Sequence, residues 1–169
     1  MRILMMLAAG AAGCPNRSLG LGQVVEPYYL LHDAGAEVVV ASVLGGDPPM
    51  RGARKRMARP IPALQRFRDD RRARDVVSDT VQFGQIWLQD FDGGICIGAL
   101  EEAAVSDADV ARGLVSDLLA AGKPVAVVPS DARLSPLGPL EGLLIVGDKA
   151  WSPPLAAKAL LAAINLGGR

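Results

Sequence analysis

Histidine and cysteine are scarce in this sequence of 169 residues, which contains one histidine, His32, and two cysteines, Cys14 and Cys96. A zinc site of the Cys/His type needs four ligands, usually in close pairs, and these three side chains are scattered along the chain. We therefore expect no metal and no cofactor. A chain of this length also buries enough surface to fold without a disulfide, and two cysteines fit a protein of the reducing cytoplasm.

Long hydrophobic runs are also missing, because no stretch reaches the roughly 20 apolar residues of a transmembrane helix. Residues 1–14 could be mistaken for a short lipoprotein signal, since small residues precede Cys14. However, the segment before the apolar run holds one basic residue, Arg2, and the run is short for a signal peptide. We expect a buried first strand instead, in a soluble cytoplasmic protein with no membrane partner.

The formal net charge is zero, but the charges are unevenly distributed. Residues 51–74 contain ten Lys and Arg against Asp69 and Asp70, whereas the rest of the chain carries eight basic and sixteen acidic residues. The segment has one aromatic residue, Phe67, and no recognisable nucleic-acid-binding motif. We interpret it as a solvated basic excursion that folds back on its own acidic domain, and we expect no nucleic-acid partner; an acidic partner is the alternative.

Short apolar strands alternate with amphipathic helices along the chain. The strands are predicted at 3–9, 37–43, 93–97, 125–128 and 143–146, and the helices at 22–34, 103–121 and 155–166. Residues 75–89 are predicted to form a short strand or loop and then a small helix. The expected buried stripe of the helix 103–121 consists of Val105, Val110, Leu114, Leu118 and Leu119.

This alternation predicts a single domain over residues 1–169: a doubly wound, mainly parallel α/β sheet covered by helices on both faces, in a three-layer sandwich. Ligands of such sheets bind at the carboxyl ends of the strands. Any chemistry is therefore expected in the loops that follow Leu7, Val43, Ile97, Val128 and Val146.

Several segments resemble the ThiJ/PfpI family, also called the DJ-1 superfamily, which has the flavodoxin-like, class I glutamine amidotransferase-like fold. Residues 23–31, 34–38, 41–42 and 45–49 look like the N-terminal signature of its heat-shock and glyoxalase-like branch. Residues 90–98 are similar to its Asp-Tyr-Asp strand and Gly-Gly-His-Gly loop. Residues 122–128 resemble the strand before its nucleophile elbow, and 141–147 its last strand.

This resemblance implies a cysteine nucleophile directly after the strand 125–128, where the chain reads Pro129-Ser130-Asp131. Proline supplies neither a thiolate nor a backbone N–H for an oxyanion hole. Gln23 stands where the resemblance implies a glutamate, and the loop after Gly98 lacks the family histidine. Few residues, 132–140, separate the elbow from the last strand. We therefore expect a shortened member that has lost the family's cysteine chemistry.

Other polar side chains are predicted to lie near this degenerate site. The ligand-pocket candidates, from loops at strand ends and from the first helix, are Cys14, Asn16, Arg17, Glu26, Gly98, Ala99 and Trp151. Trp151 forms an apolar wall of the pocket or packs against a partner subunit, and Ser130 with Asp131 forms a site or a turn. Glu101 and Glu102 act as paired carboxylates or favour a helix N-terminus. We expect Cys96 to be buried and His32 to lie at the surface.

The leading hypothesis is a catalytically degenerate protein that works by binding, as a small-molecule or protein-interaction module. It would form a homodimer or a heteromer with an active paralogue. The alternative is an enzyme, a hydrolase or lyase, with a rebuilt site that uses Ser130, Asp131, Gln23, Glu26 or Cys14. A weaker third hypothesis is a chaperone or nucleic-acid role for residues 51–74. Abundant Ala, Gly, Arg and Pro is typical of a GC-rich bacterial coding sequence, and a specialised-metabolism role is compatible with it.

Overall fold

The computed structural model describes residues 1–8, 19–51, 61–98, 105–128, 141–147 and 152–167. Within these ranges, six strands form one sheet: β1 (Arg2–Leu7), β3 (Glu37–Ser42), β5 (Val81–Gln82), β6 (Gly93–Ile97), β7 (Val125–Val128) and β8 (Leu144–Val146). The helices are α1 (Leu21–Asp33), α2 (Pro62–Asp69), α3 (Arg71–Ser78), α4 (Val105–Ala120) and α5 (Pro153–Gly167), with 3-10 turns η2 (Phe83–Gln85) and η3 (Leu88–Asp90). Strands β2 (Leu19–Gly20) and β4 (Met50–Arg51) form a small second sheet.

Strand β1 lies near the middle of the main sheet because its side chains are apolar on both faces. Ile3, Met5 and Leu7 are fully buried in one core cluster, together with residues of α1 and α5. Leu4 and Met6 are fully buried in a second cluster, together with residues of α4. Alternate residues of a strand point to opposite faces, so this continuous apolar run supplies both cores.

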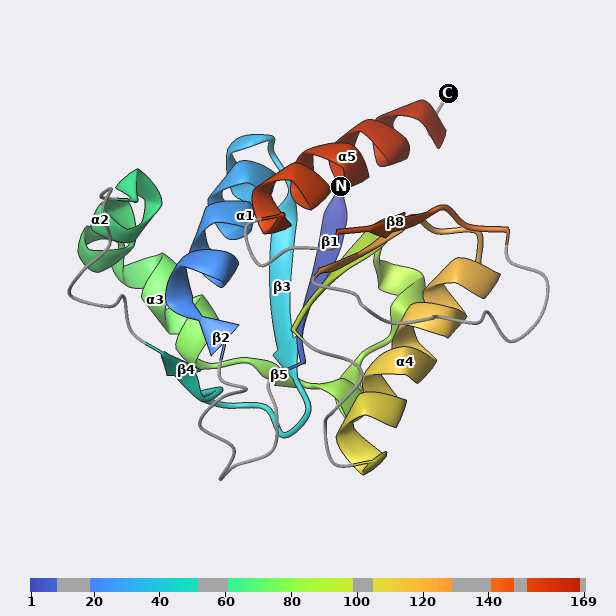
Figure 1. Ribbon diagram of the computed structural model, residues 1–169, viewed down its shortest axis with the longest axis horizontal. Helices are drawn as coiled ribbons and strands as arrows, with labels where there is room; N and C mark the ends of the chain where they lie inside the picture. Colours follow the sequence, from blue (N-terminus) through green and yellow to red (C-terminus); the bar gives the residue numbers. More distant parts are fainter. Residues whose placement is uncertain (9–18, 52–60, 99–104, 129–140, 148–151, 168–169) are drawn as a thin grey trace.

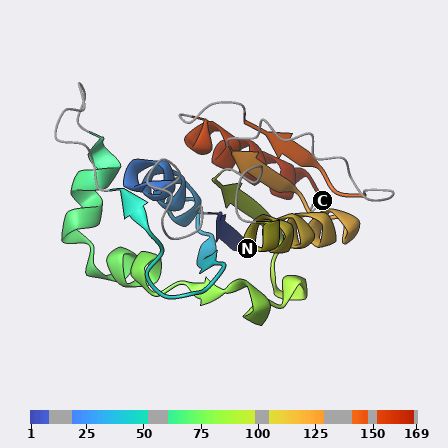
Figure 2. The ribbon, with the colours of Figure 1, turned by 60° about the horizontal axis from the view of Figure 1, so that its bottom comes forward.

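The sheet is doubly wound and parallel, with the strand order β5-β3-β1-β6-β7-β8. Helices α1 and α5 cover one face and α4 covers the other, so the protein is a flavodoxin-like, three-layer α/β sandwich (Figures 1 and 2). The chain builds outward from β1 through β3 to β5 and then returns to the other side of β1 with β6. The strand order therefore reverses between β1 and β6, and ligand crevices of such folds form at this switch point.

The predicted strands and the three long helices are confirmed to within two residues at each end. The buried stripe predicted for α4 is wrong at Val110, which is 45% exposed. Leu118 and Leu119 are buried as predicted and Leu114 is half-buried, whereas the side chain of Val105 lies outside the described residues. The buried positions of the described part of α4 are Ala111, Val115, Leu118 and Leu119. Their spacing of four, three and one residues follows one face of a helix, and the small Ala111 occupies the place that we assigned to a larger side chain.

Residues 71–78 form α3, so the strand or loop predicted from Asp75 begins only after this helix. Asp70 determines where α3 starts, because its Oδ1 accepts a hydrogen bond from the backbone N–H of Ala73 at 3.0 Å. A side chain that caps a helix in this way stabilises it typically by about 1 kcal/mol. The short strand then follows as β5, and 3-10 turns follow in place of the predicted small helix.

Candidate functional site

Gly98 lies at the switch point, directly after β6. Its backbone N–H donates to the carbonyl of Val128 at 2.8 Å, and the N–H of Ala8 donates to the carbonyl of Ile97 at 2.9 Å. Gly98 has φ +125°, and a Cβ at this position would lie 2.2 Å from the carbonyl oxygen of Ala8. Only glycine fits this position, because a residue with a side chain cannot adopt this backbone angle and its Cβ would clash with Ala8. The end of β6 is therefore built tightly against the end of β1.

Gln23 lies in the first turn of α1, where its side chain organises the start of the helix. Its Oε1 accepts a hydrogen bond from the backbone N–H of Gly20 at 3.0 Å. This contact satisfies a donor just before the helix, as the glutamine of a capping box does. Because a glutamate could accept the same hydrogen bond, the local structure permits either residue at this position.

Cys96 is fully buried in the middle of β6, as predicted, and its sulfur is a free thiol. Burial raises the pKa of this thiol to about 12. A thiol with this pKa is protonated at neutral pH and is a poor nucleophile. Cys96 therefore serves as a small apolar side chain of the core.

Most of the residues predicted for the ligand pocket and the elbow lie outside the described residues. These are Cys14, Asn16, Arg17, Ala99, Glu101, Glu102, Pro129, Ser130, Asp131 and Trp151. The grouping of these residues around Gly98 and Gln23 stays a prediction. His32 is described, lies about half exposed at the surface as predicted, and stacks on the ring of Tyr28.

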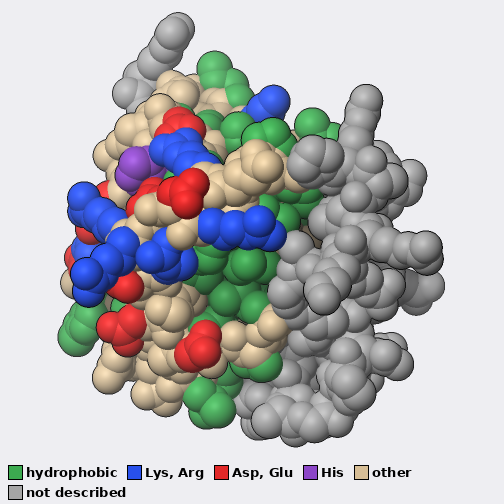
Figure 3. All heavy atoms as spheres, turned by 90° about the vertical axis from the view of Figure 1, so that its left-hand side faces the viewer, with side chains coloured by type: hydrophobic (Ala, Val, Ile, Leu, Met, Phe, Trp, Pro, Cys, Tyr) green, Lys and Arg blue, Asp and Glu red, His purple; other side chains and the backbone are tan. Residues whose placement is uncertain are grey.

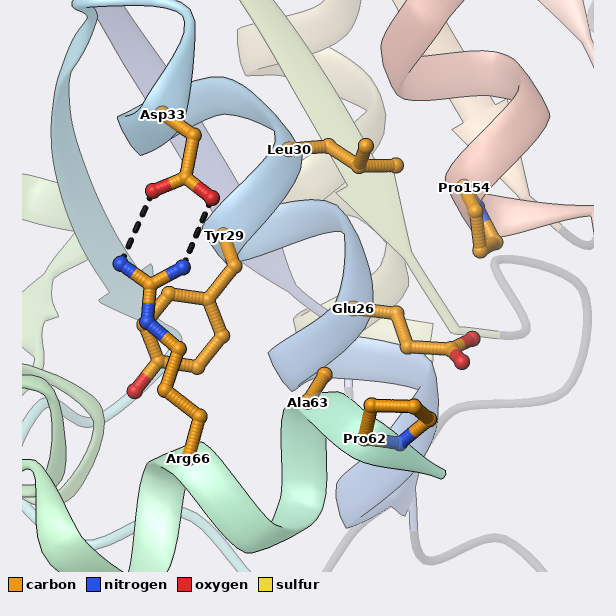
Figure 4. Close-up of a pocket in the computed structure, with 8 residues that line it drawn as sticks. All are labelled: Glu26, Tyr29, Leu30, Asp33, Pro62, Ala63, Arg66 and Pro154. Atoms are coloured by element: carbon orange, nitrogen blue, oxygen red, sulfur yellow. Dashed lines mark hydrogen bonds and ion pairs between the residues drawn. The ribbon is translucent and has the colours of Figure 1, made fainter. Parts of the chain in front are cut away.

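Glu26 does not point at the cap of α1 but lines a groove of about 460 Å³ in the helix layer (Figure 4). The groove is lined by Glu26, Tyr29, Leu30 and Asp33 of α1, by Pro62, Ala63 and Arg66 of α2, and by Pro154 of α5. Figure 4 shows the carboxylate of Glu26 at the end near Pro62 and Pro154, and the side chains of Asp33 and Arg66 at the other end. The described residues that line the groove all belong to helices.

Four side chains, which we call the Arg66 clasp, hold α1 to α2 and α3: Asp33, Arg66, Tyr29 and Asp70. The two terminal nitrogens of Arg66 donate to the two carboxylate oxygens of Asp33 at 2.7 and 2.9 Å (Figure 4). The same guanidinium lies over the ring of Tyr29, 3.9 Å from its centre. The hydroxyl of buried Tyr29 donates to Oδ2 of Asp70 at 3.1 Å. Cation–π contact and bidentate pairing together fix the orientation of Arg66.

The clasp also shifts the pKa values of its members. The hydrogen bonds from Arg66 lower the pKa of the Asp33 carboxyl below its usual value of 3.8. Burial, and then the hydrogen bond to Asp70, raise the pKa of Tyr29 to about 12. At neutral pH the clasp therefore contains a carboxylate paired with a guanidinium, and a protonated phenol that donates to a second carboxylate.

Basic and acidic side chains lie side by side on the face of the molecule drawn in Figure 3, and the described arginines of the basic excursion include several with partners inside the protein. Arg71 lies 3.7 Å from Asp75, and the guanidinium of Arg74 donates to the backbone carbonyls of Phe67 and Arg68 near the end of α2. With Arg66 in the clasp, these contacts engage three of the arginines of α2 and α3. They support the interpretation that the described part of the excursion folds back on the protein.

Within the described ranges, no group of three or more His, Cys, Asp and Glu side chains is placed to hold a metal ion. The helices of the described part include none that is long and apolar enough to cross a membrane.

The protein is a doubly wound, flavodoxin-like α/β protein. Its sheet is parallel and has the strand order of this class, with helices on both faces and a switch point that needs a glycine. No family model matches the chain, and no curated protein matches its sequence. Solved structures identify the fold more narrowly, because the structures that superpose on this chain include ThiJ/PfpI and DJ-1 proteins. The chain therefore has the DJ-1/PfpI fold.

Three solved structures illustrate this similarity. The rapid encystment protein of 24 kDa from Francisella tularensis superposes with a TM-score of 0.67 at 13% identity, over 96% of this chain and 98% of that one. Glyoxalase III from Candida albicans superposes with a TM-score of 0.63 at 11% identity, over 96% and 97% of the two chains. A ThiJ/PfpI domain protein from Brachyspira murdochii gives 0.61 at 12% identity, over 98% and 96%.

The groove and the clasp are the features that sequence reasoning missed. Glu26 lines a groove with residues of α2 and α5, and its place in the predicted strand-end pocket stays a prediction. The clasp joins residues separated by 33 and 41 positions along the chain, and no local pattern marks such pairs. One signal was available within the basic segment: Leu64 and Phe67 are three residues apart, which indicates a helix with an apolar face that packs against the rest of the domain.

Proposed function

We propose that this protein is a catalytically degenerate member of the DJ-1/PfpI superfamily that works by binding a small molecule or a partner protein. The observation that carries the proposal is the sequence after β7, Pro129-Ser130-Asp131, in the place where the resemblance implies the nucleophilic cysteine. A proline there offers no thiolate and no backbone N–H.

The two cysteines of the chain support this proposal in different ways. Cys96 cannot replace the missing nucleophile, because it is fully buried and its pKa is raised to about 12. Cys14 follows β1 rather than β7 and is the remaining thiol that could react. A test of the proposal therefore has to distinguish activity that depends on Cys14 from activity that depends on the residues after β7.

The proposal extends to the setting of the protein. We propose a bacterial cytoplasmic protein, in specialised metabolism, that acts as a homodimer or as the inactive partner of an active paralogue. A shortened connection between β7 and β8, residues 129–143, is part of the same proposal, because the family usually places further elements there.

The testing experiment measures glyoxalase and esterase activity together with alkylation by iodoacetamide. The wild type is compared with Cys14→Ser, and the double variant Pro129→Cys, Gln23→Glu serves as the positive control. Glutamate at position 23 retains the acceptor for the Gly20 N–H, so the control is expected to fold. We expect no turnover by the wild type, and a ligand screen by thermal shift should then find a compound that raises the melting temperature.

Two results would contradict the proposal. Wild-type turnover that is lost in Cys14→Ser would place the nucleophile in the loop after β1. Turnover that survives in Cys14→Ser but is lost in Ser130→Ala or Asp131→Asn would establish the alternative, an enzyme with a rebuilt site.

A further inference from the structure

We propose that the groove between α1, α2 and α5 binds a small organic cation, an ammonium group attached to an apolar body. This inference goes beyond the proposed function, because none of the residues that line the groove belongs to a strand. It holds whether or not the strand ends retain catalysis.

The charged side chains that line the groove favour a ligand with a positive charge. Its charged lining consists of two carboxylates, Glu26 and Asp33, and one guanidinium, Arg66. Asp33 and Arg66 neutralise each other through two hydrogen bonds of 2.7 and 2.9 Å. The carboxylate of Glu26 has no hydrogen-bond or ion-pair partner in the described part of the chain, which leaves one uncompensated negative charge at one end of the groove.

Arg66 does not offer an anion site that would compete with this assignment. Both of its terminal nitrogens donate to Asp33, and its face covers the ring of Tyr29 at 3.9 Å. An anion that bound there would have to break a bidentate ion pair, which is among the stronger polar contacts of proteins. Among the described residues of the lining, Glu26 is therefore the charged side chain that remains open to a ligand.

The rest of the lining suits an apolar body. Pro62 and Pro154 lie beside the Glu26 carboxylate, Ala63 and Leu30 complete the apolar lining, and Figure 4 shows the side chain of Leu30 directed toward Pro154. A groove of about 460 Å³ is within the range of small-molecule sites. An aryl-alkyl amine would place its ring on the prolines and on Leu30, and its ammonium beside Glu26.

The clasp prepares the site before the ligand arrives. Arg66 and Asp33 join α2 to α1, and α2 carries Pro62 and Ala63, which form the wall opposite α5. Because this wall is already held in place, a ligand does not have to order α2 when it binds, and less of the binding free energy is lost to conformational entropy.

The experiment uses three probes of similar size and shape: 2-phenylethylammonium, neutral 2-phenylethanol and anionic 3-phenylpropanoate. Their dissociation constants for the whole chain are measured by calorimetry, and the bound region is located from amide chemical shifts. We expect the amine to bind at least tenfold more tightly than the alcohol and the carboxylate, with shifts in α1, α2 and the start of α5.

Two variants test the assignment to the groove. Glu26→Gln keeps the shape of the side chain and should abolish the preference for the amine, whereas Ala63→Leu should fill the groove and weaken all three probes. The control Asp117→Asn removes an exposed carboxylate from α4, on the other face of the sheet, and should change nothing. The proposal is wrong if the amine binds no better than the alcohol, or if Glu26→Gln keeps the preference. Absence of amine binding at millimolar concentration would also overturn it.

Discussion

Replacement of Gly98 by alanine should strongly destabilise the protein, because the switch point tolerates no side chain there. Alanine at φ +125° is outside the backbone regions open to L-residues, which costs about 1–3 kcal/mol. In addition, the new Cβ would lie 2.2 Å from the carbonyl oxygen of Ala8, and the backbone that must move is the end of β1 in the core. Relieving such overpacking costs about 1–3 kcal/mol more.

The two contributions together predict that Gly98→Ala lowers the free energy of unfolding by about 4 kcal/mol, a large part of the stability of a typical domain. Urea denaturation measures this change as a lower midpoint with an unchanged slope. The matched control is Gly113→Ala, because Gly113 lies inside α4 with open space around it. There alanine should raise the stability by about 1 kcal/mol through its better helix propensity. A Gly98→Ala variant with the wild-type midpoint would refute the reasoning.

Three further predictions concern the clasp and the core. Tyr29→Phe removes the hydroxyl that donates to Asp70 and should lower the free energy of unfolding by about 1 kcal/mol in urea, and an unchanged midpoint would show that the hydrogen bond contributes nothing. The backbone N–H of Ala73 and then the Tyr29 hydroxyl lower the pKa of Asp70 below 3.8, so its contribution is present at neutral pH and lost as the pH falls through the lowered pKa. The stability difference between wild type and Asp70→Asn should accordingly shrink below about pH 4, and a constant difference would contradict the ionic role. In a Cys14→Ser background, Cys96 should resist iodoacetamide in the folded protein and react in urea, because its pKa is about 12 and it is fully buried; equal rates in the two states would disprove the burial.

The sheet was predictable because its strands carry strong local signals. β1, β6 and β7 are apolar runs with glycine or proline at or near their ends. A strand that is buried on both faces needs such a run. The burial of Cys96 followed from the same pattern, since both of its neighbours in β6 are isoleucine. The prediction for α4 was less accurate, because it favoured the large Val110 over the small Ala111.

The candidate site was only partly predictable. Gln23 was correctly placed at the start of α1, but its contact with the Gly20 backbone depends on the local path of the chain before the helix. Gly98 could be recognised as the end of a strand, whereas its contact with Ala8 depends on two strands that lie far apart in the sequence. The groove that Glu26 lines with α2 and α5 was not predicted, because which face of α1 meets α2 cannot be derived from α1 alone.

By itself, the sequence determined the class of the fold, because this class depends on residue type and on local periodicity. The tertiary structure decided which side chains meet: Arg66 with Asp33 and Tyr29, and Glu26 with the two prolines of the groove. Local periodicity determines which face of an element is buried. The partner of each charged side chain depends on how the helices pack against one another, and this packing is a property of the whole chain.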